Sequence, residues 1–222
     1  MVRFFDIFFS GLALIILSPI LVPVVIILKF TGEGEVFYIQ QRVGKDGKMF
    51  GLLKFATMLK DSPNIGTGDI TVKEDPRVLP FGKFLRKTKI NELPQLINIL
   101  KGDMSIIGPR PLTKRNFDLY SYEIKQYIKK VKPGLSGIGS VVFRDEENIL
   151  DNPAIDRVKF YAKYIAPYKG KLEKWYVQHQ NLYTYFILIF LTVWAVIKPD
   201  TKLHFRVFKD LPRPPKELDS KL

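Results

Sequence analysis

The chain has 222 residues, of which 46% are hydrophobic, and it carries a formal net charge of +13 at pH 7. This length suffices for one substantial domain with appendages, and the apolar content suffices for a core. Because the sequence contains no cysteine, it excludes a disulfide framework, a thiolate metal site and a thiol nucleophile. Only two histidines are present, so we expect any general base or metal ligand to be a carboxylate.

The positive charge implies an anionic partner, and nucleic acid, an anionic membrane surface and a phosphate-rich substrate all satisfy that requirement. The mean hydropathy is nevertheless close to zero, at +0.01. A chain with so many charges reaches this value only if its apolar residues gather in strongly hydrophobic blocks. Two such blocks are visible, at residues 7–28 and 182–197.

The first block contains no charged residue over roughly 20 positions, which is the length of a helix that crosses the hydrocarbon core of a bilayer. It is too long for the apolar region of a cleaved signal peptide, and no small-residue cleavage site follows it. We therefore predict a membrane segment that remains on the mature protein.

Ser18 and Pro19 lie at the midpoint of this block, and Pro23 follows one turn later. Each proline removes a helical hydrogen bond, which predicts a kink. The freed carbonyls need partners that lipid does not supply, so Ser18 or neighbouring protein must provide them. These residues leave two topologies open, a kinked single span and a re-entrant hairpin that returns to the same face. In either case the basic remainder of the chain predicts a cytoplasmic body.

The region after the first block is predicted to form a β-hairpin, because turn residues 45–48 separate the strand-like residues 36–44 and 49–58. Residues 61–76 have the composition of a loop. The hairpin is thus the clearest β structure that the sequence indicates.

Helical patterns dominate the rest of the body. A short basic helix is predicted before residue 89, and helical periodicity runs through residues 118–131 and again through 155–180, where Pro167 predicts a break. The sequence therefore predicts a helix-rich α+β body attached to a membrane.

The second block, residues 182–197, is short for a membrane span and carries tyrosine and tryptophan near its ends. This pattern favours a helix that lies at the membrane interface, while a buried core helix is the alternative. His179, just before the block, is interpreted as an interfacial polar residue. Residues 198–222 are basic and punctuated by proline, so we expect a loosely ordered tail there.

The stretch KINELPQLINIL, residues 89–100, has the features of a helix start. Asn91 is predicted to be the N-cap, with Pro94 in the first turn. Glu92 would then lie where the helix dipole favours negative charge and where phosphates also bind. A carboxylate and a phosphate repel one another unless a cation lies between them, and Mg²⁺ commonly bridges such groups. The alternative is a plain amphipathic helix with Glu92 at its surface.

Arg110 lies between two prolines in GPRP, residues 108–111, so its backbone is restricted and its planar side chain suits a phosphate. The basic residues 86–89 and Arg144 can converge on the same place, although each alone could be a solvated surface charge. Together they indicate a diphosphate site. No Walker A or dinucleotide motif is present, and the basic stretches lack the interleaved aromatic residues of a single-strand nucleic-acid binder.

Several of these segments together resemble a known family. KFATM, DPRVLPFGKFLRKTKINELPQLINILKGDMSIIGPRPL and VKPGLSG occur in order after a hydrophobic segment broken at Ser18 and Pro19. The sequence resembles the bacterial sugar transferases, the monotopic polyprenyl-phosphate phosphoglycosyl transferases, from about residue 3 to residue 197. The resemblance implies a re-entrant membrane helix at 1–30, a catalytic domain with interfacial helices at 31–197, and a basic C-terminal tail at 198–222.

The resemblance also implies an activity. Members transfer a sugar 1-phosphate from a nucleoside diphosphate sugar, usually a UDP-sugar, to polyprenyl phosphate and release UMP. Its expected partners are therefore a UDP-sugar, polyprenyl phosphate and the lipid bilayer, and not nucleic acid. The expected location is the bacterial inner membrane, with the catalytic domain on the cytoplasmic face. No motif in the chain encodes the sugar or the oligomeric state.

In the family an Asp-Glu dyad attacks the diphosphate through its Asp, and its Glu helps to hold Mg²⁺. Glu92 matches the Glu, but Asn91 occupies the position of the Asp, and an amide does not serve as that nucleophile. Three hypotheses follow. The protein is a catalytically impaired, membrane-anchored binder; or Glu92 or Glu146 attacks; or the polyprenyl phosphate attacks directly.

The resemblance assigns further roles to basic residues. Arg86, Arg110 and Arg144 match arginines around the diphosphate and nucleotide, and Lys54 matches a lysine near the same pocket. Ala56 in KFATM departs from the family, which usually has a basic residue there. Asp103 is expected to be structural, because an Asp after Gly commonly caps a turn.

Overall fold

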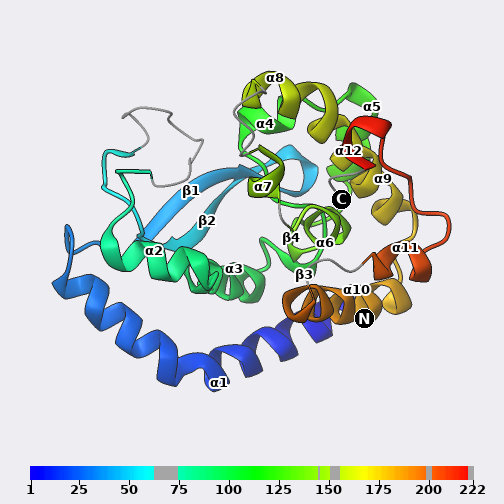
Figure 1. The fold of residues 1–222 in the computed structure, drawn as a ribbon. Helices are drawn as coiled ribbons and strands as arrows, with labels where there is room; N and C mark the ends of the chain where they lie inside the picture. The colour runs from blue at the N-terminus through cyan, green and yellow to red at the C-terminus, as the bar shows by residue number, and fades with distance from the viewer. Residues whose placement is uncertain (63–74, 145, 151–155, 199–201, 220–222) are drawn as a thin grey trace.

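The computed structural model describes residues 1–62, 75–144, 146–150, 156–198 and 202–219. One long helix, α1 (Val2–Phe30), runs beneath the rest of the protein (Figure 1). A hairpin and two helices lie above its C-terminal half, and a cluster of short helices lies at the other end. Among the described residues, the strands form two separate two-stranded sheets, so the predicted helix-rich α+β class is confirmed.

Helix α1 contains both Pro19 and Pro23 and remains helical throughout, although its axis bends near the middle (Figure 1). Pro19 lacks the N–H that would reach the carbonyl of Ile15. The hydroxyl of Ser18 donates to that carbonyl instead, at 2.7 Å. The serine thus supplies the partner that the sequence called for.

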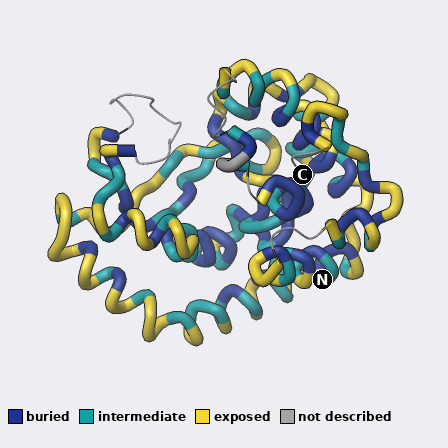
Figure 2. Tube along the Cα trace, viewed as in Figure 1, coloured by how far each residue is buried: buried dark blue, intermediate teal, exposed yellow. Residues whose placement is uncertain are grey.

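Both ends of α1 are attached to the body. Near the N-terminus, the buried Asp6 carboxylate accepts hydrogen bonds from the Ser105 hydroxyl, the Ile106 N–H and the Tyr185 hydroxyl, at 2.9, 2.9 and 3.0 Å. Near the C-terminus, Leu28 is buried in an apolar cluster. Exposed residues nevertheless occur along the whole helix (Figure 2). The helix therefore combines fixed ends with an uncovered apolar face.

The predicted hairpin is confirmed, with β1 (Phe37–Val43) antiparallel to β2 (Met49–Phe55). Its connection contains the 3₁₀ turn η1 (Lys45–Gly47), where Asp46 and Gly47 adopt φ angles of 57° and 74°. Most of the predicted loop at 61–76 lies outside the described residues.

Helix α2 (Pro80–Lys87) leads to a 3₁₀ turn, η3 (Ile90–Glu92), and then to α3 (Gln95–Lys101). The prediction that Asn91 caps the α-helix is wrong, because Asn91 lies within η3 and Pro94 holds the N-cap position. Packing explains the difference. Ile90 packs in the apolar cluster that holds Leu28, whereas α3 packs in another cluster, and the tight turn joins them.

Asn98 fixes α3 against the hairpin. Its side-chain oxygen accepts from the N–H of Leu53 at 2.9 Å, and its amide donates to the carbonyl of Gly51 at 2.8 Å. The same amide donates to Asp103, and the N–H of Asp103 donates to the carbonyl of Asn98. Asp103 thus has the structural role expected from the sequence, and α3 is held at a defined distance from β2.

A second, parallel pair of strands, β3 (Ser105–Ile107) and β4 (Gly134–Ser136), was not predicted. Its backbones approach closely at glycines: a Cβ atom on Gly134 would overlap the backbone of Gly108, and so would one on Gly137. This contact explains why the GPRP and VKPGLSG segments are rich in glycine.

Short helices follow β3 and β4. They are α4 (Lys114–Asp118), α5 (Tyr122–Ile128), α6 (Ile138–Val142), α7 (Glu146–Leu150), α8 (Arg157–Phe160), the π-helical turn η4 (Tyr161–Ile165) and α9 (Ala166–Gln178). The predicted helix at 118–131 is divided because Ser121 caps a new helix. The predicted break at Pro167 is wrong, because η4 precedes it and Pro167 falls in the first turn of α9.

Helix α10 (Leu182–Ile197) is buried on one side only. Leu188 and Leu191 lie in the main core, whereas Phe190, Val193 and Val196 are more than half exposed, at 52, 54 and 57%. The helix lies beside the N-terminus of α1 (Figure 1), where Phe186 and Phe5 are in edge contact. One face of α10 is therefore buried in the core, as the core-helix alternative expected, and its other face is apolar and exposed.

The expectation of a loosely ordered tail is wrong for the described residues of 198–222. Helices α11 (Leu203–Val207) and α12 (Lys216–Asp219) occur there. Phe205, Phe208 and Leu211 are buried in the main core. Their spacing of three residues forms an apolar stripe, and packing of that stripe outweighs the basic, proline-rich composition.

Candidate active site

Four separate elements bring the predicted basic and acidic residues together. Lys54 lies on β2, Arg86 on α2, Glu92 at the end of η3, and Arg110 in the loop that follows β3. An Nη2 atom of Arg110 lies 3.7 Å from Oε1 of Glu92. Because Asn98 fixes α3 to the hairpin, the short helix start that carries Glu92 is positioned next to the strand that carries Lys54.

Glu92 is the acidic centre of this group, and its side chain is 22% exposed. Burial alone would raise the pKa of Glu92, but the positive charges of Arg110, Lys54 and Lys89 outweigh it and hold the pKa below its ordinary value. The carboxylate is therefore ionised at neutral pH and can bind a cation.

The amine of Lys54 is strongly perturbed. Burial is the largest cause of the shift that lowers the pKa of Lys54 to about 8. Glu92 opposes the shift, and three nearby arginines add to it: Arg42, Arg110 and Arg86. So many positive charges in one place form a site for a polyanion.

The loop of Arg110 is held by hydrogen bonds on both sides. The carbonyl of Pro109 accepts from the N–H of Gly134 at 2.8 Å, and that of Pro111 accepts from the Arg42 side chain at 3.2 Å. The Arg110 guanidinium projects from this fixed backbone and remains about half exposed, at 46%. It is thus available to a ligand.

Arg42 was missed from the sequence, although the predicted hairpin contained the signal. In the register of the hairpin, Arg42 pairs with Phe50 and Tyr38 pairs with Lys54. Paired residues lie on the same face of a sheet, and so do residues two apart. The alternation along β1 therefore places Arg42 on the face that carries Lys54.

The two other predicted residues lie differently. Arg144, just after α6, is exposed and has no ion-pair partner among the described residues. Glu146 forms a salt bridge with Lys169 at 2.6 Å. Glu92 is the main cause of the raised pKa of Arg110, and the negative charge of Glu146 adds to it. Ala56, where the resemblance led us to expect a basic residue, is buried at 6% exposure.

Asn91 is buried at 7% exposure, and its side-chain oxygen has no hydrogen-bond partner. No cluster of three acidic or histidine side chains suited to a metal occurs among the described residues. A Mg²⁺ ion usually takes one or two protein carboxylates together with substrate phosphates. Glu92 supplies one such carboxylate. The surrounding cations would oppose a metal that came without a diphosphate, so metal and diphosphate are expected to bind together.

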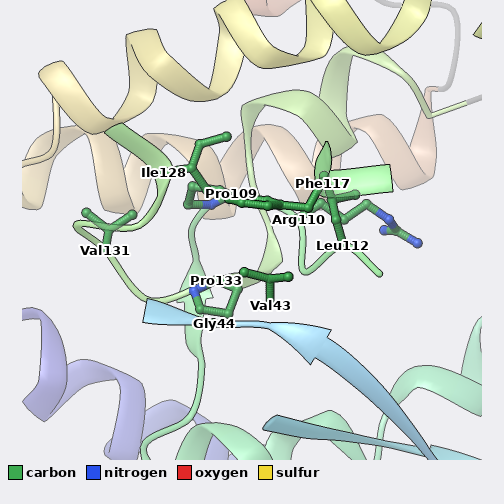
Figure 3. Close-up of a pocket in the computed structure, with 9 residues that line it drawn as sticks. All are labelled: Val43, Gly44, Pro109, Arg110, Leu112, Phe117, Ile128, Val131 and Pro133. Carbon is green, nitrogen blue, oxygen red and sulfur yellow. The ribbon is translucent and has the colours of Figure 1, made fainter. Parts of the chain in front are cut away.

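A small apolar hollow lies beside the Arg110 loop, lined by Val43, Leu112, Phe117 and Ile128 among others (Figure 3). The guanidinium of Arg110 points away from it (Figure 3). Its accessible volume of about 10 Å³ is room for roughly one water molecule. A nucleotide does not fit there, so the charged group around Glu92 is the candidate site.

Comparison with known proteins agrees with this geometry. The model of the bacterial sugar transferase family matches residues 1–199. The exopolysaccharide production protein ExoY of Sinorhizobium fredii is 32% identical over 208 residues, which cover 87% of this chain and 84% of that protein.

Two longer transferases are also similar. The undecaprenyl-phosphate galactose phosphotransferase of Salmonella typhimurium is 33% identical, over 89% of this chain and 40% of that protein. The UDP-glucose:undecaprenyl-phosphate glucose-1-phosphate transferase of Escherichia coli is 38% identical, over 72% of this chain and 35% of that protein. Since the family model matches nearly the whole chain, this protein belongs to the bacterial sugar transferase family.

Proposed function

We propose that this protein transfers a sugar 1-phosphate from a UDP-sugar to undecaprenyl phosphate and releases UMP, the first membrane step in the assembly of a polysaccharide or related glycoconjugate. The observation that carries the proposal is the pair of Glu92 and Arg110 within a group of basic side chains. The substrates follow from relatives that are named for a UDP-sugar donor and an undecaprenyl-phosphate acceptor.

The basic side chains bind and orient the diphosphate. Arg110 offers a planar fork that matches phosphate oxygens, and Lys54 and Arg86 add positive charge. In phosphoryl transfer, positioning and charge stabilisation supply most of the rate enhancement. The same cations that raise affinity for the diphosphate therefore also stabilise the negative charge on the departing UMP.

Mg²⁺ is the cofactor that we propose at Glu92, with the side-chain oxygen of Asn91 as a second protein ligand. When bound, it would neutralise charge on the diphosphate. The ionised state of Glu92 supports this assignment, as does the unpartnered buried oxygen of Asn91.

We propose that an oxygen of the polyprenyl phosphate attacks the sugar-bearing phosphorus directly. The new P–O bond forms as the bond from that phosphorus to the bridging oxygen breaks, and UMP leaves with the electron pair. Asn91 has no nucleophilic oxygen, Glu146 is bound to Lys169, and Glu92 faces Arg110. These contacts favour the lipid phosphate among the three nucleophiles that the sequence suggested.

Release of UMP tests the proposed function. Purified protein in detergent is given Mg²⁺ and a panel of UDP-sugars, with and without polyprenyl phosphate. We expect UMP release from at least one sugar only when the lipid is present. UDP-sugar binding with no UMP release across the panel would instead support the catalytically impaired, membrane-anchored binder. No observation on the described residues favours that alternative, because Glu92 and its basic neighbours are all in place.

We further propose that α1 is re-entrant and that α10 lies at the membrane interface. One helix of the described residues, α1, is long and apolar enough to cross a membrane, but the body holds both of its ends, through Asp6 and Leu28. A crossing helix would have to release one end. Helix α10 lies beside the N-terminal end of α1 (Figure 1), and both helices carry exposed apolar residues. We propose that both enter the cytoplasmic leaflet of the inner membrane, close to the lipid substrate.

Single-cysteine labelling tests this topology, because the chain has no cysteine of its own. One cysteine is placed directly after Met1 and, in a second protein, at Glu35→Cys, just beyond α1. An impermeant maleimide is expected to label both proteins in inverted membrane vesicles and neither in intact spheroplasts. Labelling of the two cysteines from opposite sides would show a spanning helix and contradict the re-entrant topology.

The pKa of Lys54 predicts the alkaline side of the activity profile. In the protein without substrate, the Lys54 side chain is a charged ammonium below about pH 8 and loses its proton as the pH rises through that value. The affinity for the anionic donor should therefore fall there. We expect kcat/KM for the UDP-sugar to decline above about pH 8. Lys54→Arg, which stays charged, should retain kcat/KM at high pH; the same decline in that variant would exclude Lys54 as its cause.

A further inference from the structure

Arg110 has a backbone N–H, whereas its neighbours Pro109 and Pro111 have none. That N–H is therefore the only backbone donor in the three-residue stretch. It donates to Oε1 of Glu173 at 3.3 Å. Glu173 lies on α9, far from Arg110 in the chain, so this hydrogen bond ties the loop of the candidate active site to the main helical core.

The approach of Glu173 to the loop depends on Gly139. A Cβ atom at position 139 would overlap Oε1 of Glu173. Gly139 lies within α6, where its φ angle is not positive, so backbone conformation does not require glycine there. Clearance for the Glu173 carboxylate is the physical reason for a glycine at this position.

Glu173 is costly to bury. It is only 3% exposed, and its second oxygen, Oε2, has no hydrogen-bond partner. A buried carboxylate with an unpaired oxygen destabilises the fold, and a neutral or apolar side chain would pack there at lower cost. The hydrogen bond from the Arg110 N–H gives a reason for a carboxylate at this buried position.

The charged and titratable groups that face Glu173 are few. They are Lys169 and Tyr176 on its own helix, Tyr120 before α5, and Arg110 itself. Burial raises the pKa of Glu173 to about 7, although the Arg110 N–H and the positive charges of Lys169 and Arg110 act in the opposite direction. The strength of its bond to the loop therefore changes near neutral pH, because an ionised carboxylate is the stronger acceptor.

We propose that Glu173 is a positioning residue for sugar-phosphate transfer: it accepts the backbone N–H of Arg110 and so fixes the direction of the guanidinium toward Glu92 and the diphosphate. This inference rests on the proposed function. Glu173 does not touch the substrate and acts only through Arg110. A displacement of about 1 Å in a positioning group can reduce a rate roughly 100-fold, so the anchor has a measurable effect.

Three variants test the proposal by UMP release: Glu173→Gln, which keeps an acceptor oxygen, Glu173→Ala, which removes it, and Gly139→Ala, which displaces Glu173. Glu123→Gln, at an exposed carboxylate paired with Lys174, is the matched control. We expect kcat to fall roughly 10- to 100-fold in Glu173→Ala and Gly139→Ala, and no more than about 3-fold in Glu173→Gln, by analogy with the modest effect of exchanging one acceptor for another.

The pH profile separates positioning from simple structural support. Wild-type activity should decline by up to about 3-fold as the pH falls below about 7, where Glu173 becomes protonated and, like a glutamine, offers only a neutral acceptor. This acidic decline should be absent in Glu173→Gln. Two results would overturn the proposal. One is an equal loss of kcat in Glu173→Gln and Glu173→Ala with the acidic decline still present in Glu173→Gln. The other is an unchanged kcat in Glu173→Ala. Melting temperatures identify any variant that fails to fold. If Glu173→Ala or Gly139→Ala fails to fold, the pH profile of Glu173→Gln tests the proposal.

A failure of the proposed transferase function can be distinguished from a failure of the positioning role. If the wild type released no UMP, the same variants would be compared for binding of a UDP-sugar by calorimetry. Weaker binding in Glu173→Ala that is restored in Glu173→Gln would support the positioning role without any turnover, whereas equal binding in all variants would overturn it.

Discussion

Glu92→Gln is expected to lower kcat for UMP release by roughly 10²–10³-fold, the usual effect of removing one group that stabilises charge in a transition state. The substitution keeps the size of the side chain but removes its charge. It thereby removes the ligand proposed for Mg²⁺ and presents an amide toward Arg110, which now lies 3.7 Å from the carboxylate. Initial rates at saturating UDP-sugar and polyprenyl phosphate measure the effect.

The matched control for this experiment is Glu146→Gln. Glu146 is the other carboxylate that the sequence suggested as a nucleophile, and it is bound to Lys169 at 2.6 Å. We expect that variant to retain most of its kcat. A larger loss of kcat in Glu146→Gln than in Glu92→Gln would contradict the central role of Glu92 in the reaction.

Arg110→Lys is expected to reduce kcat/KM by roughly 10²-fold, because a lysine cannot reproduce the planar, two-pronged contact of a guanidinium with phosphate oxygens. The positive charge is retained, so geometry rather than net charge causes the loss. The backbone bond from position 110 to Glu173 is unaffected, and the fold should persist. Steady-state kinetics with varied UDP-sugar measures the change.

Arg115→Lys, on the exposed surface of α4, is the control for this substitution. It should leave kcat/KM unchanged. If Arg110→Lys also had no effect, Arg110 would act only as a point charge, and the fixed loop that holds it would have no role in orienting the donor.

Local chemistry accounts for the parts of the fold that the sequence predicted. The hairpin followed from alternating residues on either side of a turn, and Ser18 satisfies the carbonyl freed by Pro19 as its position suggested. Both depend on interactions within a few residues, which a sequence displays directly.

The errors arose where distant residues decide the local structure. Asn91 is a favourable N-cap by type, but Ile90 and α3 pack in different clusters and impose a 3₁₀ turn. The tail appeared unstructured by composition, yet Phe205 and Phe208 reach the main core. The three-residue strands β3 and β4 are too short to show an alternating pattern.

The candidate site was predicted in outline. Arg86, Glu92 and Arg110 were predicted from the residues and Lys54 from the resemblance, and these four lie together. Arg144, predicted with them, is exposed. Glu173 could not be found in this way, because its role depends on a contact 63 positions along the chain. The residues around it on α9 contain no motif that indicates this contact.

The most direct test of direct transfer is mass spectrometry of both protein and lipid after quenching the reaction of the wild type with a UDP-sugar that it turns over. Asn91→Asp, which introduces the Asp that the resemblance assigns to this position, is run beside it as the variant expected to form an adduct. We predict that the wild type forms polyprenyl-diphosphate-sugar while the mass of its chain stays unchanged. A phosphosugar adduct on Glu92, Glu146 or any other side chain of the wild type would contradict the account.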